Sequence, residues 1–489
     1  MRSCEATHSE VVILGAGFSR AISAHLPLAN ELGEAAYDRA QSQAPNLFGS
    51  RPPFTDDYPF ENWLSLLAED QPHLDEAENR LNAARFAKLA QSIVEVLGER
   101  QALALFAPGP PWLYSLVSAF HQRKTTVVTL NYDTLLEVAV NSTYLGPPEI
   151  EGGLPRGFDD MGLGTAASKA PRVSPEDVIG SQPPLSALPR QAPEATMHLL
   201  KLHGSLGWWW VPNDASGATL AREAILSTFE HPVRLTDEQR RTLPGREPFI
   251  VPPLAAKSPY YRNPLTRQLW RDAFEAMRTA DRISFVGYSL PRADLVMAGM
   301  IDTSLRGRET DIDVVDLDPD VIAERLFSLG GPEKDSDRLA CFSGESAVEK
   351  FAGALCDETA RDVPPSMTRL TGVADQTRRE MAVVTWSLGG SPVQHRVVAV
   401  GRDSDGTLRL TTDPWVNYGA QPSEQEPTTL DILRHAGGAE RIVARTPQGQ
   451  ESVIVGYNAP NFDNPNARHV IYLIAAGQLP AQEAGTVAS

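Results

Sequence analysis

Short apolar runs recur along the first two thirds of the chain, and each ends in a turn of small or polar residues. Short runs rich in Val, Ile and Leu are typical of strands that are buried on both faces of a parallel sheet. The expected strands are Val11–Leu14, Thr125–Leu130, Thr196–Leu202, Arg282–Val286 and Asp311–Leu317.

Leucine and alanine recur at helical spacing between these runs. Phe60–Glu69 and Glu76–Phe106 contain no internal proline and predict helices, and Pro108–Pro111 ends the second one. Further helices are expected after the strand-end turns. The alternation of strands and helices predicts an α/β fold with a Rossmann-like, doubly wound parallel sheet and helical insertions.

One long segment interrupts this alternation. Tyr144–Pro193 is rich in Gly, Pro and Ser and has little periodicity. A segment of this composition and length predicts a surface insertion, of the kind often found as a lid over a site.

The pattern changes beyond residue 357. Lys350 is the last lysine, Pro364 and Pro365 interrupt the chain, and alternating β-like segments follow. We therefore expect a first domain at residues 1–356 and a smaller C-terminal α+β domain at 357–489.

The expected elements of this tail begin with a hairpin, in which His395–Val400 and Thr407–Thr412 flank the turn-forming Asp403–Gly406. A short helix is expected next, at Thr428–His435. Strands are expected after it, at Glu440–Arg445, Ser452–Val455 and His469–Ile474.

Composition narrows the classes of partner. The 489 residues carry a formal charge of -18, which disfavours direct binding of nucleic acid or of anionic membranes. Three cysteines without C-x-x-C spacing cannot form a disulfide framework. The polar N-terminus does not resemble a signal peptide, and no apolar run approaches the ~20 residues of a membrane-spanning helix. We expect a cytoplasmic protein with no membrane segment.

Glycines mark the end of the first expected strand. Gly15-Ala16-Gly17-Phe18-Ser19 lies between this strand and an expected helix, where a phosphate can reach main-chain N–H groups. Tight packing of strand on helix explains the same glycines equally well.

Asn131 and Asp133 follow the second expected strand, and His203 follows the third. Ligands of open parallel sheets collect at these strand ends, so the side chains can reach one pocket. Each residue also has a simpler explanation, because Asn and Asp cap helices and most histidines are structural.

The last two strands of the sheet have similar ends. Gly287 and Ser289 follow the strand Arg282–Val286, and Asp316 lies at the end of the next strand, where an acid can hold ribose hydroxyls. Helix capping is an equally good explanation for the acid.

In their order, these four elements resemble the motifs of the sirtuin family: Gly15–Ser19, Thr129–Asp133, Leu202–Gly204 and Gly287–Ser289. The resemblance covers roughly residues 9–320. Deacetylases of that family carry a zinc module of paired C-x-x-C motifs and a P-D-F-R motif, and both are missing here. Pro59–Leu64, Ile250–Pro253 and Lys257 instead resemble the sirtuin-like NAD hydrolase effectors of bacterial antiphage defence.

The resemblance implies roles for the motif residues. Gly15, Ala16, Gly17, Phe18 and Ser19 would bind the diphosphate of NAD. Asn131 and Asp133 would face the nicotinamide ribose and the carboxamide, with His203 nearby as the second catalytic residue. Gly287 and Ser289 would line the adenosine half, and Asp316 would contact a ribose. NAD would be the substrate, and no metal is implied.

The expected activity is hydrolysis of NAD to nicotinamide and ADP-ribose, in an effector that depletes NAD during phage infection. Since uncontrolled NAD loss would kill the host, we expect a homo-oligomer or a complex with a defence partner or a phage-derived trigger. The alternatives are a noncatalytic NAD or ADP-ribose sensor and an NAD-dependent protein deacylase. A peptidase-like reading of His395 and Asp413 in the tail lacks a nucleophile, because the tail has no cysteine beyond Cys356.

Overall fold

A computed structural model of the chain describes residues 9–142 with gaps at 51 and 56–57, residues 197–362 with several gaps between 213 and 262 and one at 293, and strands between 381 and 475. The predicted insertion Tyr144–Pro193, Lys257 and the turn Asp403–Gly406 lie outside the described residues.

A six-stranded parallel sheet forms the centre of the first part of the chain. Its strands are β1 Glu10–Leu14, β2 Thr126–Thr129, β3 His198–Lys201, β7 Arg282–Val286, β8 Asp311–Asp316 and β9 Leu339–Ser343. The predicted α/β class is confirmed, and the five expected strands are present within a few residues of their expected ends.

The strand order β3-β2-β1-β7-β8-β9 places β1 at the centre. The chain runs outward from β1 to β3 on one side, then returns to β7 on the other side of β1. This order has a topological switch point between β1 and β7, and crevices in doubly wound sheets open at the carboxyl ends of strands at such a point.

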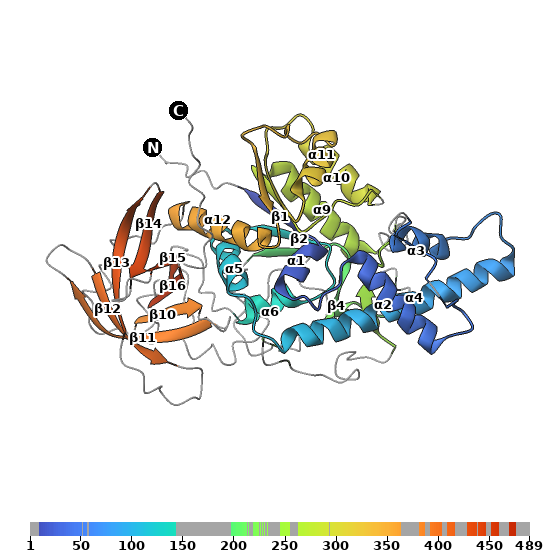
Figure 1. Cartoon of the computed structure of the whole chain (residues 1–489), viewed down its shortest axis with the longest axis horizontal. Coiled ribbons are helices and arrows are strands. Elements are labelled where there is room, and N and C mark those ends of the chain that lie inside the picture. Colours follow the sequence, from blue (N-terminus) through green and yellow to red (C-terminus); the bar gives the residue numbers. More distant parts are fainter. Residues whose placement is uncertain are drawn as a thin grey trace.

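Helices cover both faces of the sheet (Figure 1). Val12 and Leu14 point to one face, and Val11 and Ile13 point to the other. This alternation buries β1 completely and follows from the two-residue period of a strand. The first face packs on α1 Ala16–Ile22, α5 Pro111–Arg123, α6 Leu135–Ser142 and α12 Ala347–Asp362; the second packs on α9 Pro264–Thr279, α10 Leu295–Leu305 and α11 Pro319–Ser328.

A helical insertion follows α1 and has its own aromatic core. Its helices are α2 Ala29–Gln43, α3 Phe60–Ala68 and α4 Glu76–Leu105. The last two confirm the helices expected from leucine and alanine spacing. Asp75 and Glu78 form a capping box that starts α4, since the Asp75 carboxylate accepts from Glu78 N at 2.8 Å and Glu78 accepts from Asp75 N at 2.9 Å.

A small antiparallel sheet in the order β5-β4-β6 begins directly after His203. Its strands are β4 Gly204–Trp210, β5 Ala221–Arg222 and β6 Glu247–Ile250. Gly204 has a φ of +79°, and a Cβ there would lie 2.2 Å from the carbonyl oxygen of Phe249. Glycine at 204 therefore lets the chain turn sharply from β3 into β4 beside the histidine.

Beyond Asp362, the described residues are strands that close on one another into a seven-stranded barrel. They are β10 Met381–Trp386, β11 Pro392–Arg402, β12 Leu408–Trp415, β13 Thr428–Gly437, β14 Ala439–Arg445, β15 Glu451–Asn458 and β16 His469–Ala475. The expected hairpin is confirmed as β11 and β12. The helix expected at Thr428–His435 is wrong, because β13 pairs with both β12 and β14. The α+β character of the tail as a whole stays a prediction.

Helices α5 and α12 lie between the parallel sheet and the closed sheet of the tail (Figure 1). Helix α12 contacts β14 and β15, and α5 contacts β10 and β15. Residue 357, where a domain boundary is expected, lies within α12. The boundary itself stays a prediction.

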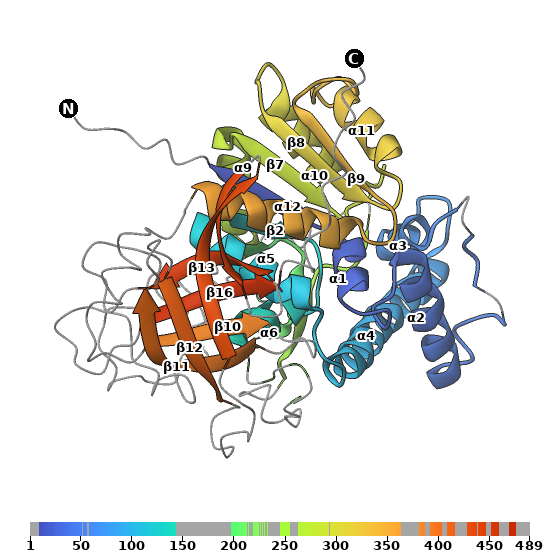
Figure 2. The same cartoon turned by 60° about the vertical axis from the view of Figure 1, so that its left-hand side comes forward.

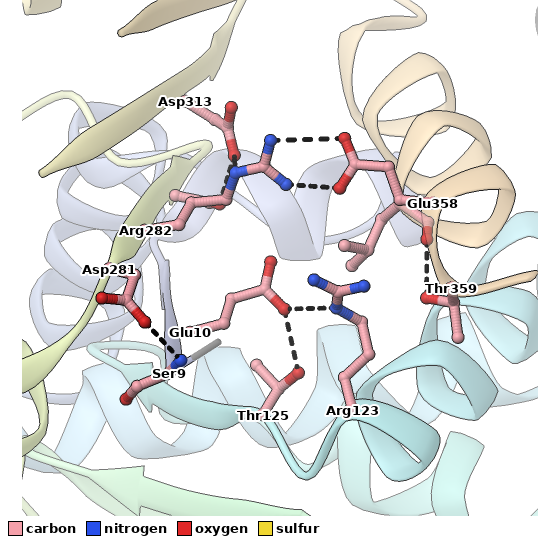
Figure 3. A network of polar contacts seen from close by, with 11 residues as sticks. Ser9, Glu10, Arg123, Thr125, Asp281, Arg282, Asp313, Glu358 and Thr359 are labelled. Atoms are coloured by element: carbon pink, nitrogen blue, oxygen red, sulfur yellow. Dashed lines mark hydrogen bonds and ion pairs between the residues drawn. The ribbon is translucent and has the colours of Figure 1, made fainter. Parts of the chain in front are cut away.

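Charged side chains cluster at the amino ends of the strands, opposite the switch point (Figure 3). The buried Glu10 accepts from Arg123 Nε at 2.9 Å. Arg282 pairs with Glu358 of α12 and lies 3.6 Å from the Asp313 carboxylate. These ion pairs join α5 and α12 to β1, β7 and β8.

Asp313 gives this cluster a pH dependence. Burial raises the pKa of its carboxyl to about 6, although Arg282 and the Ser284 hydroxyl act in the opposite direction. An acid whose pKa is raised on folding stabilises the fold fully below its unfolded pKa of about 3.9, and this contribution is lost as the pH rises through the folded pKa.

We expect Asp313→Asn to remove this titration. The free energy of unfolding of the parent, minus that of the variant, should fall by about 2 kcal/mol between pH 4 and pH 7. Denaturant titrations at several pH values measure the difference, and Asp335→Asn at an exposed carboxyl controls for the lost charge. A difference that does not change with pH would contradict the prediction.

Candidate active site

Four turns meet at the carboxyl edge of the sheet. The neighbouring strands β3, β2, β1 and β7 end at His203, at Asn131, at the turn Gly15–Gly17 and at Gly287, respectively. Parallel strands that pair in register bring their carboxyl ends to one edge. The structure therefore brings the predicted catalytic residues and the glycine turn to one edge of the sheet. Figure 2 shows the parallel sheet together with α1, which begins at the glycine turn.

The two glycine turns are in direct main-chain contact. Gly17 N donates to Gly287 O at 2.9 Å, and Gly15 N donates to Val286 O at 3.0 Å. A Cβ at Gly15 would lie 2.5 Å from Gly287 O, and one at Gly287 would lie 2.2 Å from Phe18 N. Gly287 also has a φ of +60°. The glycines thus allow β1 and β7 to end against one another.

This packing uses main-chain N–H groups of the turn after β1. The N–H groups of Gly15, Gly17 and Phe18 donate within the protein, to Val286 O, Gly287 O and Gly15 O. The Phe18 ring is 2% exposed and packs edge-on against Trp112 in the core. These three residues therefore pack within the protein, and their expected contacts with the NAD diphosphate stay a prediction. Ala16 is exposed at the turn, and its binding role stays a prediction.

A chain of side-chain hydrogen bonds joins the first turn to the second. Asn131 Nδ2 donates to Gly15 O at 2.7 Å and to Ser19 Oγ at 2.9 Å. Ser19 Oγ donates to Asp133 Oδ2 at 2.6 Å, and Asp133 Oδ1 accepts from Leu135 N at 3.1 Å. Ser19 and Asp133 are both buried. Buried polar groups are stable only when paired in this way.

The direction of these bonds fixes the orientation of the Asn131 amide. The Gly15 carbonyl can only accept, so the amide group facing it must be Nδ2. The single Ser19 proton goes to the Asp133 carboxylate, which leaves the Ser19 oxygen to accept the second Nδ2 proton. Asn131 Oδ1 is then directed elsewhere, and no residue in the described ranges donates to it. It is an acceptor available to a ligand.

His203 is held between aromatic rings. It is 6% exposed, with the Tyr132 ring stacked at a centroid distance of 6.3 Å and the Trp270 ring tilted at 6.4 Å. Its carbonyl accepts from Val251 N at 2.8 Å, and Val251 O accepts from the Tyr132 hydroxyl at 2.7 Å. The residue next to Asn131 therefore fixes the surroundings of His203.

The β7 turn continues in a strained conformation. Leu290 has a φ of 48°, a left-handed value that is uncommon for residues other than glycine. The Arg325 guanidinium stabilises this turn by donating to Ser289 O at 2.8 Å and to Leu290 O at 3.0 Å. Ser289 is exposed at the edge, where its side chain can reach a ligand.

Asp316 ends β8, one strand further from the switch point. Burial raises the pKa of its carboxyl, while main-chain N–H groups at Asp318 and Leu317 act in the opposite direction. The carboxylate is half-buried beside β7. This position suits the predicted ribose contact but also fits the capping alternative, and the role stays a prediction.

Several residues around the site gave no motif-level signal in the sequence. Trp270 and Arg325 contact the site only because distant segments pack together. Lys201 had one visible signal, since it is a lysine inside the otherwise apolar Leu199–Leu202. Within the described ranges, no group of three or more His, Cys, Asp or Glu side chains is placed to hold a metal ion. Among the described helices, none combines the length and apolarity needed to cross a bilayer.

Comparison with known proteins gives one family match. A family model described as a SIR2-like domain matches residues 125–315. This segment reaches from β2 into β8 and includes Asn131, His203 and Gly287, whereas the glycine turn after β1 precedes it. The chain is thus similar to a SIR2-like domain over the part that runs from β2 into β8. No curated protein sequence matches the chain.

Several solved structures are similar to the chain. A Sir2 enzyme studied for its mechanism and regulation has 12% identity, covering 72% of this chain and 93% of its own, with a TM-score of 0.31. A Sir2 protein with a p53 peptide and NAD+ has 14% identity, covering 71% and 92%, with a TM-score of 0.27. A Sir2 protein bound to acetylated peptide has 13% identity, covering 71% and 92%, with a TM-score of 0.28. Because the identities and TM-scores are this low, no activity is inferred from these structures.

We expect Gly287→Ala to destabilise the protein by at least about 3 kcal/mol, because the new Cβ meets main chain in a left-handed conformation. Denaturant unfolding measures the loss. Gly98→Ala is the matched control: Gly98 lies within α4 with nothing within 4 Å of its Cβ position, so alanine should stabilise by up to about 1 kcal/mol. Equal stability of the two variants would show that the β1 and β7 turns are not in close contact.

Proposed function

We propose that the protein hydrolyses NAD at the bond between nicotinamide and ribose. The observation that carries this proposal is the placement of Asn131 and His203 at the ends of adjacent strands, beside the β1–β7 switch point, in a segment that matches a SIR2-like domain. Switch points of doubly wound sheets are where nucleotides bind.

The chemistry asks for orientation and charge stabilisation more than for a strong nucleophile. The nicotinamide ring of NAD is positively charged, and it leaves with the electron pair of the C1′–N1 bond as that bond breaks. Water then adds to C1′ and releases one proton. The products are nicotinamide, ADP-ribose and that proton, and the transition state resembles an oxocarbenium ion.

Asn131 supplies the orientation in this proposal. Its Nδ2 is held by Gly15 O and Ser19 Oγ, so Oδ1 can accept a hydrogen bond from the attacking water or from a ribose hydroxyl. A preorganised acceptor does not have to reorient as the reaction proceeds.

His203 acts as the general base that takes the proton from water, a contribution worth ~10²–10⁴-fold in rate. The surrounding Tyr132 and Trp270 rings limit the access of bulk water and hold the imidazole in one orientation. Each carboxylate oxygen of Asp133 accepts one hydrogen bond within the protein, and its expected contact with the carboxamide stays a prediction. We assign it the positioning of Ser19 and Asn131.

Incubating the purified protein with NAD and separating the products by chromatography tests the proposal. The parent should release nicotinamide and ADP-ribose, and His203→Ala or Asn131→Ala should lower kcat at least about 100-fold. His73→Ala, at an exposed histidine before α4, is the matched control and should retain the parent rate.

Three other outcomes would contradict the assignment. If His203→Ala turned over NAD at the parental rate, His203 would not be the general base. Bound NAD that stays intact would favour the noncatalytic sensor. Nicotinamide release only with an acylated lysine peptide would favour the deacylase.

We further propose that the activity serves antiphage defence by depleting NAD, under the control of self-assembly, a partner or a phage-derived trigger. The closed sheet of the tail is the candidate control module, because it contacts α5 and α12, which pack on the catalytic sheet. Bacteria expressing the parent should lose NAD after phage infection, and those expressing His203→Ala should keep it. If the purified protein hydrolyses NAD but the NAD level of infected cells does not change, the defence role is contradicted and the proposed activity is not.

A further inference from the structure

Lys201, the last residue of β3, is a fully buried lysine. It is 1% exposed and ranks among the largest completely buried side chains of the described residues. Burying an ammonium group is costly unless hydrogen bonds and an opposite charge compensate, so fully buried lysines are rare.

The ammonium has two partners, both on the element that follows β2. Lys201 Nζ donates to the main-chain carbonyl of Asp133 at 2.5 Å and to Glu137 Oε1 at 2.8 Å. Asp133 lies in the turn between β2 and α6, and Glu137 lies in the first turn of α6. The lysine thus holds the β2–α6 turn from the neighbouring strand.

This turn presents the groups that orient Asn131. The Asp133 carboxylate accepts from Ser19 Oγ, which accepts from Asn131 Nδ2. The Asp133 carbonyl and carboxylate belong to one residue, so a shift of the carbonyl also moves the carboxylate. A misplacement of about 1 Å can cost on the order of 100-fold in rate.

We propose that Lys201 is a positioning residue, which fixes the Asp133–Ser19–Asn131 hydrogen-bond chain by holding the Asp133 carbonyl. Its catalytic consequence rests on the proposed function. Glu137 supplies the opposite charge beside the buried ammonium. Lys201 touches neither substrate nor the reacting atoms.

The alternative is that Lys201 and Glu137 form an ion pair that matters only for stability. Removing one partner then destabilises the protein by leaving a buried charge, and removing both restores stability. A positioning role predicts that the double variant regains stability but not kcat, because the hydrogen bond to the Asp133 carbonyl stays lost. The double variant therefore separates the two explanations.

The experiment compares the full-length parent, Lys201→Met and Lys201→Met/Glu137→Leu. The single variant should unfold at a lower temperature, and the double variant should recover most of the loss. In the double variant, kcat for NAD should stay about 10- to 100-fold below the parent with little change in KM. Arg39→Met, which breaks an ion pair with Glu99 away from the sheet edge, should leave kcat unchanged.

Amide hydrogen exchange gives a readout that does not require activity. In the free double variant, the segment 129–135 should exchange at least about 10-fold faster than in the parent, while β7 and β8 keep their protection. Parental exchange and parental kcat in the double variant would overturn the positioning role. If the parent itself fails to cleave NAD, the proposed function fails, and the exchange measurement still decides the role of Lys201.

Discussion

The approach of the Gly17 main chain to that of Gly287 is the contact on which the candidate site depends. Strands β1 and β7 are neighbours only because the chain reverses its direction across the sheet between β3 and β7. Gly17 N then lies 2.9 Å from Gly287 O, and the contact leaves no room for a Cβ on either glycine. This contact sets the position of α1 and hence of Ser19, to which the neighbouring strand-end residues are bonded.

The two edges of the sheet handle their polar groups in different ways. At the carboxyl edge, hydrogen bonds between Ser19, Asn131 and Asp133 satisfy buried groups and leave one amide oxygen available. At the amino edge, ion pairs such as Arg282 with Glu358 join the sheet to the helices that contact the tail. The candidate site and the helices that contact the tail therefore lie at opposite ends of the strands.

Particular residues show how far the sequence could predict this arrangement. The apolar runs ending at Leu14, Leu130 and Val286 identified strands, because a strand buried on both faces can contain little else. The segment Thr428–His435 was predicted wrongly, since a short mixed run fits either period and its pairing with β12 and β14 decides the outcome. Phe18 was predicted to bind NAD from its place in the Gly15–Ser19 motif, and the sequence did not indicate that its ring packs against Trp112.

The sequence by itself determined the five strands expected for the parallel sheet, the residue types at their ends and the absence of paired cysteine motifs, because these depend on local composition and spacing. The tertiary structure decided which glycine N–H groups are already bonded, which way the Asn131 amide faces, and that Lys201 holds the Asp133 carbonyl. Those features join residues far apart in the chain, and no local pattern records which distant partner will satisfy a buried polar group.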